Sequence, residues 1–259
     1  MDLDHYASLL FNAQLDLAEE YRQGCIPRTL YKYFPMGMDA ADERRIDALS
    51  HNLVWLWPLS KQNDPDEASA LVIDAEKMKQ KGYPNRIIER CSKILQLPRE
   101  DLMTASFTEV LPSKSVMWDR YANNAKGFCA EYAVENPAKL YEVLYEDGKI
   151  AVNYVFEEFI QELAKELLGN NPSPSVLARC AQWTAFQCFI KSCKWSDEKE
   201  YRILYPSPKD REGAYARIGD VGLKLRRVIA GKFCSDENTK LLESSARSLG
   251  VPFVNSSSF

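Results

Sequence analysis

The sequence Trp195-Ser196-Asp197-Glu198-Lys199-Glu200-Tyr201-Arg202 is the most informative stretch of this chain, and it leads into the apolar and aromatic residues 203–205. Such a composition predicts a strand that starts at about Glu198. Because side chains alternate along a strand, Glu198, Glu200 and Arg202 would share one face. The stretch therefore predicts two carboxylates and a guanidinium that point into one cleft.

This arrangement suits acid–base chemistry or the stabilisation of a cation. A neighbouring carboxylate raises the pKa of its partner, while the Arg202 guanidinium holds a carboxylate ionised. A structural interpretation is equally compatible with the residues. In it Ser196 or Asp197 caps an acidic helix, or the charges lie on the solvent side of an edge strand.

The composition bounds the class of protein. With 259 residues and 46% hydrophobic content, the chain is long enough for one elaborated domain. We expect an N-terminal helix in 1–26, a motif-bearing core over 28–232, a C-terminal helix in 233–254 and a loose tail at 255–259. No stretch approaches the roughly 20 apolar residues of a membrane span, and the first residues do not resemble a signal peptide, so we expect a cytoplasmic protein.

Cysteine and charge patterns argue against a metal site or a global attraction to nucleic acid. Seven cysteines lack any Cys-x-x-Cys pair and only two histidines occur, so we expect no metal and treat the thiols as core. The formal net charge of −4 gives no field that gathers nucleic acid. The basic strip Lys224-Leu225-Arg226-Arg227 is a local exception, although a solvated strand edge explains it as well.

Secondary-structure signals are spread irregularly along the chain. Short β-branched and aromatic runs predict strands at about 29–34, 53–57, 104–108, 127–132, 142–145, 200–205 and 223–229. Apolar periodicity predicts helices at about 40–49, 67–81, 85–98, 154–168, 175–193 and 236–249. Strands with irregular helical insertions favour an α+β fold with a mixed or antiparallel sheet over a doubly wound α/β fold. We expect the apolar strand residues to be buried: Trp55, Trp57, Phe107, Phe128 and Ile203.

Two further segments have both a structural and a functional interpretation. Residues 63–67, Asn-Asp-Pro-Asp-Glu, form a turn sequence that needs no function, yet their amide and carboxylates suit a sugar or an amide group. Trp118 and Tyr121 are three residues apart and thus share a helical face. They fit a hydrophobic core or a stacking site for a flat base, and the local sequence does not decide between these.

Five motifs, taken together and in order, resemble a large bacterial family known only as a domain of unknown function and found near phage-defence genes. The resemblance covers about residues 28–232. The motifs are Leu30-Tyr31-Lys32-Tyr33, Leu56-Trp57 with Ser60 and residues 63–67, Ser106-Phe107-Thr108-Glu109, Met117-Trp118-x-x-Tyr121-Ala122 with Gly127-Phe128, and Trp195-x-x-Glu198-x-Glu200-Tyr201-Arg202.

The same layout is similar, more distantly, to the ADP-ribosyltransferase superfamily. Its members have a first strand with His or Arg, a Ser-containing loop after the second strand, and a late strand with the catalytic Glu, often as Glu-x-Glu. Here Lys32 or Tyr33 would take the first position, Ser60 with Asn63 the loop, and Glu198 with Glu200 the late strand. The chain departs from the pattern in having neither His nor Arg in its first strand.

This resemblance implies an ADP-ribosyltransferase-like fold with NAD bound between two halves of a split sheet. It implies a mono-ADP-ribosyltransferase, a toxin or phage-defence effector, with NAD as substrate, a protein or nucleic acid as acceptor and a possible antitoxin. Glu200 or Glu198 would stabilise the oxocarbenium-like transition state while the other carboxylate orients the acceptor. The residues implied to contact NAD are Tyr31, Lys32, Tyr33, Ser60, Asn63, Trp118, Tyr121 and Arg202.

Two other function classes remain open from the sequence. The first is a non-catalytic nucleotide-binding or phage-sensing module that uses the same cleft. The second is a nuclease, which the two histidines and the absence of a compact carboxylate set disfavour. Whichever holds, one site requires the strand around Tyr31–Tyr33, the loop at Asn63 and the stretch after Trp195 to converge in space.

Overall fold

The computed structural model describes residues 1–37, 41–64, 66–171, 173–207 and 212–255. It confirms the α+β class. The helices are α1 Leu3–Phe11, α2 Leu15–Gly24, α3 Ala41–Ser50, α4 Ala75–Gln80, α5 Asn85–Asp101, α6 Ser115–Tyr121, α7 Asn153–Leu167, α8 Pro174–Phe186 and α9 Asp236–Ser248. The strands are β1 Thr29–Phe34, β2 Leu53–Pro58, β3 Leu71–Val72, β4 Leu102–Thr108, β5 Phe128–Val134, β6 Tyr141–Glu142, β7 Leu144–Tyr145, β8 Ile150–Ala151, β9 Ile190–Lys191, β10 Glu200–Pro206, β11 Ala214–Arg217, β12 Leu223–Ala230 and β13 Phe253–Asn255.

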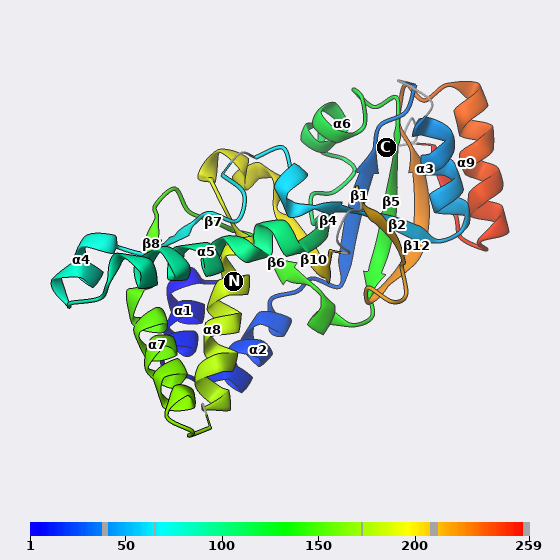
Figure 1. Ribbon diagram of the computed structural model, residues 1–259. Coiled ribbons are helices and arrows are strands. Elements are labelled where there is room, and N and C mark those ends of the chain that lie inside the picture. Colours follow the sequence, from blue (N-terminus) through cyan, green and yellow to red (C-terminus); the bar gives the residue numbers. More distant parts are fainter. Residues whose placement is uncertain (38–40, 65, 172, 208–211, 256–259) are drawn as a thin grey trace.

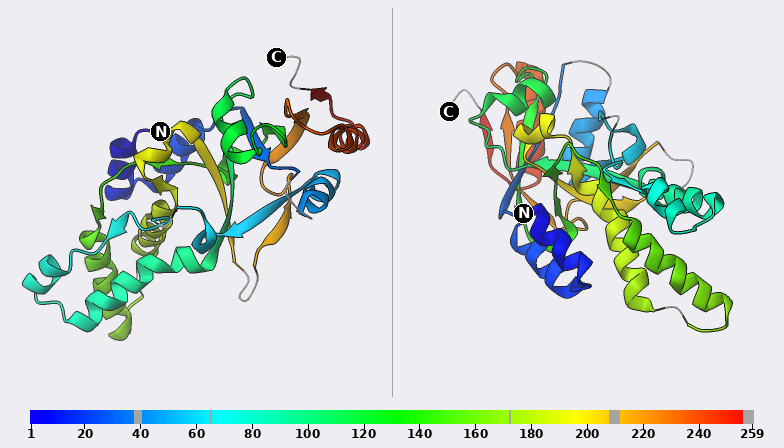
Figure 2. Two further views of the ribbon diagram at one scale, coloured as in Figure 1. Left: turned by 90° about the horizontal axis from the view of Figure 1, so that it is seen from above. Right: turned by 90° about the vertical axis from the view of Figure 1, so that its left-hand side faces the viewer.

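The elements gather into a sheet part and a helical part (Figure 1). Nine of the described strands form a mixed, mostly antiparallel sheet in the order β11-β2-β4-β1-β5-β12-β13, with β10 paired to β4 and β6. Helices α3 and α9 lie against this sheet, whereas α1, α2, α5, α7 and α8 form the helical part, and Figure 2 shows α7 and α8 projecting away from the sheet.

Each part has its own apolar core. One cluster of buried side chains comes mainly from the sheet and α9, with Phe128, Ile203 and Leu242 among its members. A second cluster, which includes Leu10 and Trp183, joins the helices to each other. No helix in the described residues has the length and apolar content that a membrane crossing requires.

Strand β4 pairs with β10 along one edge and with both β1 and β2 along the other. β10 pairs with it along its whole length, from Leu102 to Thr108, so β1 and β2 must share its other edge. β1 meets this edge at Thr108, and β2 meets it at Met103 and Thr104. The register thus leaves 105–107 of β4 between the ends of the two strands. An opening between β1 and β2 results.

Several predicted helix boundaries were wrong. The helix expected over 67–81 is reduced to α4, because Leu71–Val72 pairs with β8 and Asp74 then caps the helix through the Lys77 amide. The helix expected to end before Pro98 continues to Asp101, since a proline in the last turn removes only one helical hydrogen bond.

Two other expected helices are shorter or divided. The helix expected over 175–193 ends at Phe186, and the chain continues through a 3₁₀ turn into β9. The N-terminal segment contains two helices, α1 and α2, rather than one. Of the expected loose tail, residues 256–259 lie outside the described part of the chain.

The burial predictions were right for three of five aromatic and aliphatic residues. Phe107, Phe128 and Ile203 are buried. Trp55 and Trp57 are 37% and 43% exposed, against expectation. The reason is the alternation of β2, whose other side chains face the core while the two indoles face the opening beside β4.

Candidate functional site

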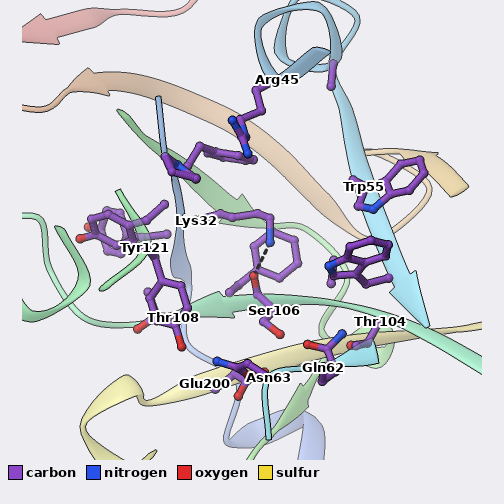
Figure 3. Close-up of a pocket in the computed structure, with 18 of the residues that line it drawn as sticks. Lys32, Arg45, Trp55, Gln62, Asn63, Thr104, Ser106, Thr108, Tyr121 and Glu200 are labelled. Carbon is purple, nitrogen blue, oxygen red and sulfur yellow. Dashed lines mark hydrogen bonds between the residues drawn. The ribbon is translucent and has the colours of Figure 1, made fainter. Parts of the chain in front are cut away.

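A cavity of about 940 Å³ occupies the opening between β1 and β2 (Figure 3). Its walls come from β1, α3, β2 with the loop that follows it, β4, α6 and β11, and its floor includes Lys191, Glu198 and Glu200. This volume lies at the upper end of the range of small-molecule sites, roughly 300–1,000 Å³. Segments more than a hundred residues apart therefore share one site, which confirms the predicted convergence.

Seven of the ten predicted site residues line this cavity: Tyr31, Lys32, Tyr33, Asn63, Tyr121, Glu198 and Glu200. The other three do not. Ser60 is exposed outside the lining, where the neighbouring Lys61, Gln62 and Asn63 take its expected place. Trp118 and Arg202 are buried behind the walls.

Trp118 belongs to the packing of the wall. Its indole Nε1 donates a hydrogen bond to the Pro112 carbonyl at 2.7 Å. Its ring meets the Tyr33 ring edge-on, with centroids 5.0 Å apart. Trp118 thus packs against Tyr33 inside the wall. Tyr121, on the same helix α6, lines the cavity instead.

Glu198 does not lie on the strand, contrary to the prediction. It ends a 3₁₀ helix, Cys193–Glu198, and Lys199 then adopts a left-handed conformation with φ of 43° before β10 begins at Glu200. This conformation is unfavourable for a residue with a Cβ atom, and such strain is often held at functional sites. Both carboxylates still reach the cavity floor, while the Lys199 side chain pairs with Glu109 at 3.0 Å.

Lys191 connects the two carboxylates. Its Nζ donates to Glu198 Oε2 at 2.8 Å and to Glu200 Oε2 at 3.0 Å, and all three side chains are buried. Burial alone would lower the pKa of Lys191, but the charges of Glu200 and Glu198 raise it above its usual value. Sequence analysis did not identify Lys191, because an uninterrupted helix was expected over 175–193.

Glu198 has a second partner in Tyr121 of α6. The Tyr121 hydroxyl donates a hydrogen bond to Glu198 Oε1, and Arg120 lies 3.7 Å from the same oxygen. Burial and the contact with Glu198 raise the pKa of Tyr121, so its hydroxyl stays protonated and remains a donor. Glu198 is thereby held between Lys191 and Tyr121.

Arg202 holds Glu200 in position from the side that faces away from the cavity. Its Nε and Nη2 donate to the two carboxylate oxygens of Glu200 at 2.6 and 3.1 Å. The same guanidinium pairs with Glu67 and donates to the Cys188 carbonyl at 2.7 Å. Because Glu67 covers its free side, Arg202 cannot reach a ligand in the cavity.

The protonation state of Glu200 follows from these contacts. Burial alone would raise its pKa, but the charges of Arg202 and Lys191 and the hydrogen bonds from Arg202 lower the pKa to about 2. Glu200 is therefore ionised at neutral pH. Three carboxylates, Glu67, Glu198 and Glu200, share this network with the buried cations Lys191 and Arg202, and the partly exposed Arg120 also pairs with Glu198.

Lys32 stands at the back of the cavity (Figure 3). Its Nζ donates to the Ser106 carbonyl at 2.8 Å, in the part of β4 that lies between β1 and β2. Among the residues that the structure describes, no carboxylate lies within ion-pair distance of it. Burial lowers the pKa of Lys32 to about 8, although the charge of Glu200 opposes this shift.

The wall opposite Tyr121 is aromatic. Trp55 and Trp57 of β2 and Tyr215 of β11 line it, and the Trp55 ring lies edge-on to both other rings at 6.0 and 4.8 Å between centroids. Sequence reasoning assigned these indoles to the core. The sequence of β2 shows which side chains alternate, but it does not show that an opening lies beside the strand.

Comparisons with known proteins describe only part of the chain. A family profile described as a protein of unknown function (DUF2971) matches residues 117–203, which lie within the range of the resemblance inferred from the motifs. The comparisons with curated proteins and with solved structures give no significant match. Across the described residues, no group of three or more His, Cys, Asp or Glu side chains is placed to hold a metal ion.

Proposed function

We propose that this protein cleaves NAD at the bond between nicotinamide and ribose and transfers ADP-ribose to an acceptor. The observation that supports the proposal best is the cavity floor, where the ionised Glu200 carboxylate is held in position by Arg202 and Lys191 and faces a large cavity. Cleavage of NAD develops positive charge on the ribose. A fixed anion at that point stabilises the transition state more than the ground state.

Glu200 is the carboxylate proposed to face the ribose. It is ionised, and Arg202 and Lys191 hold it in one position, so little reorganisation is needed as charge develops. The bond between ribose C1′ and the nicotinamide nitrogen breaks, and its electron pair leaves with neutral nicotinamide. A nucleophile of the acceptor then bonds to C1′ and gives up its proton.

Glu198 is proposed to orient that nucleophile and to accept its proton. Its two oxygens are already directed by Lys191 and by the Tyr121 hydroxyl. A carboxylate within hydrogen-bond reach of the nucleophile is the usual arrangement for a general base. The two carboxylates thus have different proposed roles.

The rest of the cavity suits a dinucleotide. Figure 3 places Tyr121 on one side of Lys32 and Trp55 on the other, so two aromatic walls flank a cation. Lys32 is available to a pyrophosphate, since its only hydrogen bond among the described residues goes to a carbonyl. Tyr33 or Tyr121 would lie against nicotinamide near the floor. The role of a toxin or phage-defence effector, which the family resemblance implies, remains part of the proposal.

Release of nicotinamide tests the proposal. The purified protein is incubated with NAD, and free nicotinamide is measured over time by chromatography. Enzymatic release that is lost in Glu200→Gln and kept in Glu109→Gln is the expected result, because Glu109 lies outside the cavity lining. Binding of NAD without release would favour the non-catalytic nucleotide-binding module instead.

A further inference from the structure

The aromatic wall of the cavity consists of three rings that are partly open to water. Trp55, Trp57 and Tyr215 are 37%, 43% and 46% exposed, although they lie beside one another on β2 and β11. Removing a large aromatic side chain from water is energetically favourable. Three exposed rings that line one side of a cavity therefore indicate a surface for a flat ligand group.

Cationic groups accompany these rings. The Lys61 Nζ lies 5.8 Å from the centre of a Trp57 ring, and Arg44 of α3 lines the same cavity. Lys32 lies between this wall and Tyr121 (Figure 3). Lys61 also pairs with Glu212 at 3.7 Å. Arg44 and Lys32 are therefore the cations toward which a ligand stacked on the indoles would direct an attached phosphate group.

Gln62 supplies a polar group of the right kind for an adenine ring. It lines the cavity directly after Lys61, and Figure 3 shows it on the same side of Lys32 as Trp55. A primary amide can accept from the exocyclic amino group of adenine and donate to its N7 at the same time. Aromatic rings, cations and an amide able to recognise the edge of a base thus line the same cavity.

We infer that the wall formed by Trp55, Trp57 and Tyr215 is a binding site for adenine nucleotides, with the base stacked on the indoles and the phosphates directed toward Arg44 and Lys32. The direction of the bound dinucleotide rests on the proposed function. The site itself does not need nicotinamide. ADP and ADP-ribose should therefore bind, whereas nicotinamide mononucleotide, which lacks the adenine, should bind weakly.

Calorimetric titration of the full chain with ADP, ADP-ribose and nicotinamide mononucleotide tests this inference. We expect ADP and ADP-ribose to bind with Kd values within about tenfold of each other, and nicotinamide mononucleotide to bind at least about tenfold more weakly, since base stacking on an aromatic side chain contributes about 1–3 kcal/mol. Trp57→Ala should weaken ADP binding at least about tenfold, and Trp57→Phe should restore most of it.

Phe233→Ala is the matched control, because Phe233 is also an exposed aromatic residue but does not line the cavity. Equal effects of Trp57→Ala and Phe233→Ala on ADP binding would overturn the inference. So would equal affinities for ADP and nicotinamide mononucleotide, or binding of a single-stranded oligonucleotide that needs Trp57 while ADP does not bind. Thermal melts of each variant establish that the fold is intact.

The same set of measurements separates this inference from the proposed function. ADP binding that depends on Trp57, in a protein that releases no nicotinamide, supports the adenine site and contradicts the cleavage of NAD. Release of nicotinamide by a protein whose ADP binding does not depend on Trp57 supports the cleavage of NAD and contradicts the adenine site.

Discussion

The floor and the aromatic wall of the cavity differ in how deeply their side chains are buried and how firmly they are held. At the floor, Glu200 is buried and bonded to Arg202 and Lys191, so its charge and position are fixed. At the wall, Trp55 and Trp57 are more than one-third exposed, and their rings meet edge-on. The contrast fits the two proposals, in which the fixed floor acts on the reacting atom and the exposed wall binds the base.

The largest expected effect concerns the cation under the floor. Arg202→Met leaves Glu67 and Glu200 buried without their shared partner, and removal of one member of a buried ion pair costs about 3–5 kcal/mol. Urea unfolding measures the loss. Arg247→Met, at an exposed pair with Glu243, should cost less than about 0.5 kcal/mol. A loss below about 1 kcal/mol for Arg202→Met would mean that the floor is not held by this network.

Next in size is the effect of Glu200→Gln on turnover. If Glu200 contacts charge only as it develops, the rate of nicotinamide release should fall by roughly two orders of magnitude or more, with little change in NAD affinity. Glu198→Gln should reduce the rate less or alter the choice of acceptor. Thermal melts of both variants accompany the assay. A Glu200→Gln protein that melts normally and turns over like the parent would refute the catalytic role.

A smaller effect is expected from pH at Lys32. Its ammonium should lose its proton near pH 8, so ADP binding should weaken roughly tenfold between pH 7 and pH 9.5, the usual contribution of a hydrogen bond to a charged group. Calorimetry at both pH values measures this change. Lys32→Met should abolish it, and an equal pH dependence in that variant would assign the effect to another group.

The same shift in pKa predicts a change in stability with a definite sign. The unfolded chain keeps the proton on Lys32 up to about pH 10.5, whereas the folded chain loses it near pH 8. Between these values the unfolded state binds more protons, so the contribution of Lys32 to the free energy of unfolding rises with pH. This contribution should be absent in Lys32→Met.

The smallest effect concerns the strained link between the two carboxylates. At Lys199, with φ of 43°, glycine has no steric penalty, so Lys199→Gly should be more stable than Lys199→Ala by about 1 kcal/mol. Both variants lose the pair with Glu109, which makes the comparison independent of that contact. Equal stability in urea unfolding would show that the left-handed conformation is not strained.

The sequence predicted the floor better than the wall. Glu200 and Arg202 were expected to act together because a strand alternates, and the ion pairs between them agree with that. The sequence could not show that Glu67, far away in the chain, covers Arg202 and removes it from the cavity. It also could not show Lys191, because a short strand pairing with β7 overrode the helical pattern there.

Trp55 and Trp57 illustrate a different reason for failure. Apolar residues in a strand are normally expected in the core, and that rule ignores a gap in the sheet. The gap arises because β1 and β2 meet β4 at different positions, at Thr108 and at Met103–Thr104. Strand pairing over such distances is a tertiary property, so the aromatic wall became visible only with the fold.

A crystal structure of the protein with NAD bound tests the central claim most directly. We predict that the dinucleotide occupies the cavity between β1 and β2, with adenine on Trp57, the pyrophosphate at Lys32, and the ribose next to nicotinamide within contact distance of Glu200. NAD bound elsewhere on the molecule, or bound in this cavity with its nicotinamide ribose turned away from Glu200 and Glu198, would contradict it.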